Sequence, residues 1–135
     1  MADGELNRPA RRLDQPAPPP AFRMERVDAP EGVVLLVLAG EIDIATSGRF
    51  RAIVETAVDE GCSLVADMAE VAFMDSSMLR ELLRAHRDLA ASGRRFLLAA
   101  PQAPVRRLLE LTGTAKLFAS AESRDEALSD AVGRS

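Results

Sequence analysis

The run "VVLLVLAG", residues 33–40, constrains the fold of this chain more than any other segment. It is continuously apolar, rich in β-branched residues and closed by Gly40. A strand that is apolar on both faces must be covered on both faces, as in parallel sheets with crossover helices on each side. The run is also far shorter than the roughly 20 apolar residues that a membrane-spanning helix needs. The sequence therefore predicts a buried central strand and no direct insertion into a membrane.

Hydrophobic periodicity around this run predicts the other elements. A helix begins near Thr46 and ends at Gly61, and a second, with Met78, Leu79, Leu82, Leu83 and Leu89 on its apolar face, runs to Gly93. The remaining predicted elements are strands at 21–27, 62–68, 94–100 and 116–119 and helices at 104–113 and 123–132. The order β-β-α-β-α-β-α-β-α predicts an α/β fold, with a mixed sheet parallel in its centre and flanking helices.

Composition separates a tail from one domain and limits the partners. Residues 1–20 hold five of the eight prolines and few apolar residues, so we expect a flexible proline-rich tail followed by a single domain over 21–135. The formal net charge of −4, with interspersed charges, argues against nucleic acid as a partner. Residues 1–20 lack the apolar core of a signal peptide. The single cysteine, Cys62, is expected to be a small buried hydrophobe, and one thiol fits a reducing cytoplasm.

Motifs for catalysis, metals and nucleotides are missing. Ser76 and His86 lie ten residues apart on one predicted helix, so roughly 15 Å of helical rise separates them and they cannot share a hydrogen bond. We expect His86 to be a packed structural residue. One cysteine and one histidine do not make a zinc site, and there is no glycine-rich phosphate loop. The sequence predicts neither an enzyme nor a cofactor or metal.

Polar side chains follow two of the predicted strands. Glu41 and Asp43 come after the first buried strand, and Asp75, Ser76 and Ser77 follow the next one along the chain. The carboxyl ends of parallel strands meet at one edge of a sheet, where sites usually form. From periodicity alone, the simpler interpretation is that Asp43, Thr46 and Asp75 cap two helices. Two serines behind an aspartate are nevertheless more than a cap requires.

Three segments together resemble a known family. "GEIDIATSGRF", "VAFMDSSMLRELL" and "APVRRLLELTG" stand in the order and spacing of a bacterial anti-sigma factor antagonist, the small stand-alone form of the STAS domain. The resemblance implies a mixed sheet flanked by helices, with Ser76 phosphorylated by an anti-sigma factor that is also a serine kinase. The unphosphorylated form of such a protein binds the anti-sigma factor and frees the sigma factor, and a serine phosphatase reverses the modification.

The resemblance also implies a partner-binding surface around Ser76 and shows one departure. The expected partner-binding residues are Glu41, Asp43, Thr46, Asp75, Ser77 and Met78. Met78 stands where the family has a glycine, at a place where a partner could approach the backbone. Two other interpretations stay open. One is a STAS interaction subunit of a lipid-transport ATPase or stress-sensing complex, in which the serine is never modified. The other is an aspartyl-phosphate receiver domain, which Lys116 disfavours because it begins the last predicted strand instead of ending it.

Overall fold

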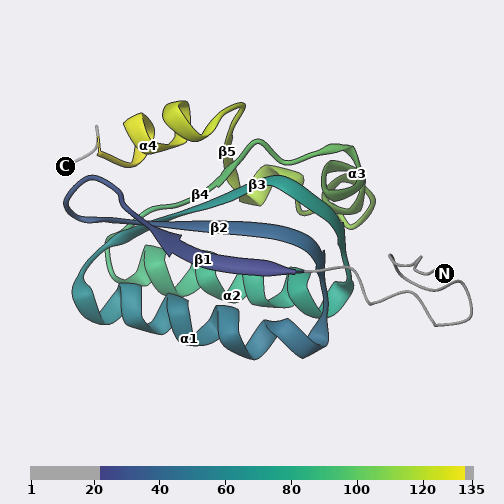
Figure 1. Cartoon of the computed structure of the whole chain (residues 1–135), viewed down its shortest axis with the longest axis horizontal. Coiled ribbons are helices and arrows are strands. Elements are labelled where there is room, and N and C mark those ends of the chain that lie inside the picture. The colour runs from purple at the N-terminus through teal and green to yellow at the C-terminus, as the bar shows by residue number, and fades with distance from the viewer. Residues whose placement is uncertain (1–21, 133–135) are drawn as a thin grey trace, which may run out of the picture.

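The computed structural model describes residues 22–132 and shows the predicted mixed sheet (Figure 1). The expected tail, residues 1–20, lies outside this range. The five strands stand in the sheet in chain order, with β1 antiparallel to β2 and the rest parallel. The elements are β1 (Arg23–Val27), β2 (Val33–Ile42), α1 (Ile44–Glu60), β3 (Ser63–Met74), α2 (Ser76–Ala91), β4 (Phe96–Ala99), α3 (Ala103–Leu111), the 3-10 turn η1 (Ala115–Leu117), β5 (Ala119–Ala121) and α4 (Arg124–Val132).

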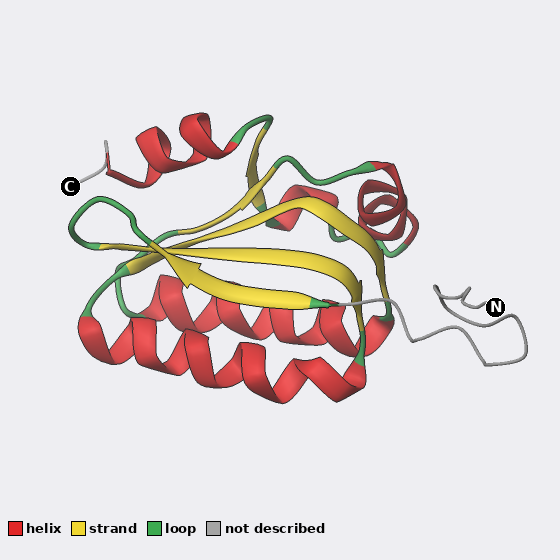
Figure 2. Ribbon diagram, viewed as in Figure 1, coloured by secondary structure: helices red, strands yellow, loops and turns green. Residues whose placement is uncertain are grey.

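Helices cover the two faces of the sheet unequally (Figure 2). α1 and α2 lie side by side on one face, where the larger hydrophobic cluster includes Phe50, Leu82 and Phe96. α4 covers the other face over a smaller cluster that includes Leu35, Leu97 and Ala127. The apolar residues of β2 alternate between these two clusters, so the prediction of a strand buried on both faces is confirmed. Within residues 22–132, no helix combines the length and apolarity needed to cross a membrane.

β3 is longer than the sequence pattern predicted. It runs for 12 residues, because Val71 and Met74 keep contributing buried side chains after the expected end at residue 68. Its pairing with β4 ends at Asp67 and Ala99, whereas its pairing with β2 continues to Ile42 and Met74. α3 lies against β3, and Val105 and Leu109 of this helix join the larger cluster. The second half of β3 therefore has β2 on one side and α3 near the other.

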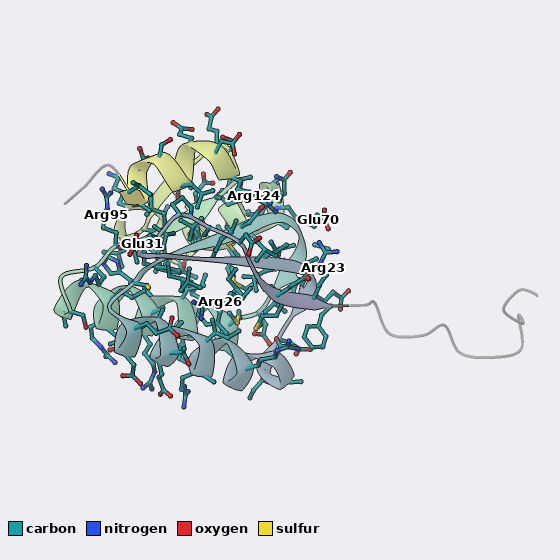
Figure 3. The ribbon with its side chains drawn as sticks, turned by 60° about the vertical axis from the view of Figure 1, so that its left-hand side comes forward. Arg23, Arg26, Glu31, Glu70, Arg95 and Arg124 are labelled. Atoms are coloured by element: carbon teal, nitrogen blue, oxygen red, sulfur yellow. The ribbon has the colours of Figure 1, made fainter. Side chains whose placement is uncertain are left out.

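Two ion pairs link other elements to the central strand β3 (Figure 3). Arg23 of β1 reaches across β2 to Glu70 of β3 at 3.3 Å, although both side chains are largely exposed. The buried Asp67 carboxylate accepts a 2.8 Å hydrogen bond from Arg124 at the start of α4. Asp67 also accepts from the Ala69 N–H, so its two oxygens both have donors. The Asp67–Arg124 pair holds the start of α4 against β3, whereas the Arg23–Glu70 pair links β1 to β3.

Three predicted details need correction. α1 begins at Ile44, before the expected Thr46, because Asp43 caps it and Ile44 is an exposed first-turn residue outside the apolar stripe. The last strand is Ala119–Ala121, since residues 115–117 form a 3-10 turn in which the Leu117 N–H donates to the Thr114 carbonyl. Cys62 is half-buried at the rim of the larger cluster, so it is less enclosed than expected.

Candidate functional site

The carboxyl ends of β2 and β3 bring the predicted polar residues together. Ile42 and Met74 are paired in register, and the Asp75 N–H donates to the Ile42 carbonyl at 3.3 Å. Asp43 and Asp75 therefore follow adjacent strand ends at the same edge of the sheet. Each aspartate is the N-cap of the helix that follows it. The structure confirms that both aspartates cap helices, and it places the two caps at the sheet edge where sites usually form in a parallel sheet.

The cap of α1 is a closed hydrogen-bonded box. The Asp43 carboxylate accepts from the Ala45 N–H at 2.9 Å. The Thr46 hydroxyl accepts from the Asp43 N–H at 3.2 Å and donates to the Asp43 carbonyl at 2.9 Å. Thr46 is buried, so its hydroxyl faces the helix end and not the solvent. Of the expected partner-binding residues, Thr46 is therefore placed beneath the surface, with a capping role.

The cap of α2 does not use the hydroxyls of the two serines that follow it. The Asp75 carboxylate accepts from the Met78 N–H at 3.0 Å, which satisfies one of the first-turn donors. Ser76 is the first helical residue and is exposed, whereas Ser77 is half-buried. The Ser77 hydroxyl lies 3.5 Å from the Arg80 guanidinium one turn further on. Capping needs neither serine, so the hydroxyl of Ser76 is available to another molecule.

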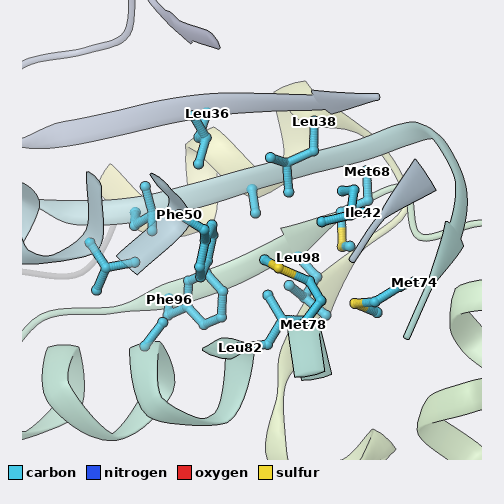
Figure 4. Close-up of a cluster of buried hydrophobic side chains, with 14 of the residues drawn as sticks. Leu36, Leu38, Ile42, Phe50, Met68, Met74, Met78, Leu82, Phe96 and Leu98 are labelled. Atoms are coloured by element: carbon cyan, nitrogen blue, oxygen red, sulfur yellow. The ribbon is translucent and has the colours of Figure 1, made fainter. Parts of the chain in front are cut away.

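Met78 does not take part in the surface of this site. Its side chain is 0% exposed and belongs to the same cluster of buried side chains as Ile42, Leu82 and Leu98 (Figure 4). We therefore correct the expectation that Met78 contacts a partner. It occupies the third position of α2, where the side chain points into the core beneath Ser76 and Ser77. The departure from the family's glycine adds core packing and leaves the outer face of the turn unblocked.

A buried carboxylate ties the two helices together behind the site. Glu81 of α2 is buried and accepts two hydrogen bonds from the Arg51 guanidinium of α1, one of them at 3.1 Å from Nε. The hydrogen bonds from Arg51 lower the pKa of Glu81 against the opposing effect of burial, and the charges of Arg51, Arg84 and Arg80 act in the same direction. Sequence patterns could not find this pair, because 30 residues separate its members.

The groups at this site suit a residue that receives an anionic group. His86 packs edge-on against Phe118 with ring centroids 6.0 Å apart and is half-buried, as predicted for a structural histidine. Within residues 22–132, no three histidine, cysteine, aspartate or glutamate side chains gather as metal ligands. The first turn of α2 offers a hydroxyl, backbone N–H groups and the positive end of a helix dipole, all of which suit an anionic group on Ser76.

Comparisons with known proteins agree with this geometry. The STAS domain family model matches residues 26–127, and the chain belongs to the STAS domain family. SpoIIAA, an anti-sigma factor antagonist, is 28% identical; its unphosphorylated structure covers 85% of this chain and 99% of its own, with a TM-score of 0.69. The phosphorylated form of SpoIIAA, a cell fate determinant from Bacillus, aligns over 82% of this chain and 98% of its own, with 28% identity and a TM-score of 0.63.

Two further structures show the range of proteins that share this fold. An anti-sigma factor antagonist from Mycobacterium paratuberculosis is 27% identical over 82% of this chain and 94% of its own, with a TM-score of 0.72. The mouse anion transporter Slc26a9 is 21% identical over 76% of this chain but only 18% of its own, with a TM-score of 0.64. The transporter likeness shows the fold alone. The solved anti-sigma factor antagonists match this chain over nearly their whole length.

Proposed function

We propose that this protein is an anti-sigma factor antagonist that phosphorylation of Ser76 switches off. The unphosphorylated chain binds an anti-sigma factor that is a serine kinase, and binding frees the sigma factor. The kinase modifies Ser76, and a serine phosphatase restores it. The chain is a substrate in this cycle and not a catalyst, and the cycle operates in the cytoplasm. The observation that carries the proposal is an exposed serine that capping does not use, placed on the first turn of α2 in a STAS domain.

A phosphate at this position is compatible with the fold. It adds about −1.5 to −2 charge, and a helix N-terminus stabilises an anion by about 0.3–1 kcal/mol. Arg80 lies one turn along the same helix and carries a guanidinium toward the serines. Asp75 is already committed to the Met78 N–H, so the cap does not depend on the serine hydroxyls. We expect the phosphorylated protein to stay folded.

An interface pressed against the same turn tolerates the phosphate much less. A desolvated or unpaired phosphate in an interface costs several kcal/mol, and about 2.7 kcal/mol already weakens binding a hundredfold. The proposed partner surface is acidic and consists of Glu41, Asp43, Asp75, Ser76 and Ser77, with Thr46 and Met78 supporting it from beneath. Local repulsion is therefore enough for a switch, and no global rearrangement is required.

The test uses the purified serine-kinase anti-sigma factors of the organism from which the chain comes. We expect one of them to bind the wild type and Ser76→Ala, to bind Ser76→Asp at least tenfold more weakly, and to transfer phosphate only to the wild type. Circular dichroism of each variant checks the fold. Binding without phosphate transfer to any form would contradict the switch and favour a STAS interaction subunit. An acid-labile phosphate would instead favour the receiver interpretation.

A further inference from the structure

A groove opens beside the candidate site, between the second half of β3 and α3. It has a volume of about 400 Å³. Its lining residues come from the end of β3 and from the outer face of α3, and they are Phe73, Met74, Ala103, Pro104, Arg107, Leu108 and Leu111. The groove exists because β4 stops pairing with β3 at Asp67, which leaves this stretch of β3 beside a helix and not beside another strand.

Two large apolar side chains on this groove face the solvent. Phe73 is 50% exposed and Leu111 is 79% exposed, although the hydrophobic core of the domain is complete without them. Exposed apolar groups that line one concave surface mark interaction sites, whereas single scattered ones need no explanation. Phe73 and Leu111 are therefore candidates for burial against another molecule.

The groove continues the proposed partner surface. Phe73 is paired in register with Glu41, and both side chains are exposed. Phe73 also precedes Ser76 by three residues, which is about 10 Å of extended chain. A molecule that covers Ser76 and Glu41 therefore reaches Phe73 without extending far, and one interface can include both the serine and the groove.

The charge of the groove restricts what it can hold. Among its lining residues, all within the described part of the chain, the one charged group is Arg107, which is exposed, and there is no carboxylate. An apolar side chain fits the Phe73 and Leu111 walls, and a neighbouring carboxylate would pair with the Arg107 guanidinium. Charge complementarity therefore favours an acidic residue flanked by an apolar one over a basic segment.

We propose that this groove is a second contact for the anti-sigma factor inferred above, and that it takes an apolar side chain of that partner with an adjacent carboxylate on Arg107. This inference rests on the proposed function and assigns different roles in binding to the groove and to Ser76. The groove contributes affinity in both modification states, because the phosphate lies outside it. Ser76 determines the ratio of the partner affinities of the unphosphorylated and phosphorylated forms. The two contacts are separable by mutation.

The experiment uses titration calorimetry to measure the dissociation constants of the complexes between this chain and the purified serine-kinase anti-sigma factors. We expect Phe73→Ala and Arg107→Glu each to weaken binding tenfold or more, and Arg107→Lys to weaken it less than threefold. Val132→Ala is the matched control, because Val132 is also 50% exposed but lies at the end of α4. It should change the affinity less than twofold. Introducing Ser76→Asp should weaken binding by the same factor in the Phe73→Ala background as in the wild type.

Each outcome separates the groove from the proposed function. Normal wild-type binding with unchanged affinities for Phe73→Ala and Arg107→Glu overturns the groove and leaves the switch intact. Failure of every kinase to bind the wild type overturns both. Analytical sedimentation of the chain alone at micromolar concentration tests whether a second copy of the chain occupies the groove instead. A wild-type dimer that Phe73→Ala dissociates would make a second copy the occupant and overturn the inference.

Discussion

The first turns of α1 and α2 start from adjacent strand ends with the same cap residue, yet they use their hydroxyl groups differently. Asp43 begins α1 and Asp75 begins α2, and each carboxylate accepts a hydrogen bond from a first-turn N–H. In α1 the third helical residue is Thr46, whose buried hydroxyl closes a box with Asp43. In α2 the third residue is Met78, which packs in the core, while Ser76 is exposed and Ser77 is half-buried.

This difference separates capping from the proposed switch within one edge of the sheet. A hydroxyl that stabilises a helix end is buried and hydrogen-bonded to its own cap, as Thr46 is. A hydroxyl that accepts a phosphate must be reachable by a kinase and removable without loss of the fold; Ser76 is exposed, and the Asp75 cap bonds the Met78 N–H without it. The comparison therefore makes opposite predictions for Thr46 and Ser76 in stability and in phosphorylation.

The largest expected effect comes from Met78, which occupies in α2 the helix position that the capping residue Thr46 occupies in α1. Met78→Gly should destabilise the protein by about 3–6 kcal/mol, because loss of a buried methionine side chain costs about 2–5 kcal/mol and glycine in a helix about 1 kcal/mol more. Urea denaturation measures the change. Ser77→Gly, at the preceding and less buried position, is the control and should cost about 1 kcal/mol or less. Equal losses at both positions would contradict the packing role of Met78.

A smaller effect is expected when the closed cap of α1 loses its hydroxyl. Thr46→Val keeps the branched shape but leaves the Asp43 N–H without its acceptor, so the free energy of unfolding should fall by about 1–2 kcal/mol. Ser76→Ala should change it by less than about 0.5 kcal/mol, since an exposed side chain without a capping role is removed. A stability loss in Ser76→Ala as large as that in Thr46→Val would erase the distinction between the two turns.

The Arg51–Glu81 contact between α1 and α2 should make a smaller, pH-dependent contribution to the free energy of unfolding. The folded state lowers the pKa of Glu81, so the unfolded chain binds a proton more readily and stability is lost as the pH falls from about 5 through the lowered value. Above that range the contribution is fully present. Glu81→Gln should be less stable than the wild type at pH 7 and should lose less stability on acidification. Parallel curves of unfolding free energy against pH for the two proteins would show that the Arg51 contact does not shift Glu81.

Local patterns in the sequence predicted much of this region. The continuous apolar run at 33–40 and the helical stripes gave the element order, and Asp75 before Ser76 gave the start of α2. Met78 was assigned both to the apolar stripe of a helix and to a partner surface, and the structure decides for the stripe. Leu82, four residues on, was the signal, since residues at this spacing share one helical face.

Other features depend on contacts that no local pattern contains. Glu81 and Arg51 meet only after α1 and α2 pack on the same face of the sheet, and Asp67 meets Arg124 across 57 residues. The groove at Phe73 requires both the extension of β3 and the early end of β4, which short apolar segments do not reveal. The register that brings Asp43 beside Asp75 was expected from parallel topology, but its detailed pairing follows from two irregularities between β2 and β3.

Peptide mapping after kinase treatment tests the central claim most directly, namely that Ser76 is the functional hydroxyl of this edge. The wild type, Ser76→Ala, Ser77→Ala and Thr46→Val are incubated with ATP and the anti-sigma factor kinase that binds the wild type, and phosphate is located by mass spectrometry. We predict one phosphate on Ser76 in the wild type, Ser77→Ala and Thr46→Val, and none in Ser76→Ala. Phosphate that persists in Ser76→Ala and vanishes in Ser77→Ala or Thr46→Val would contradict the account.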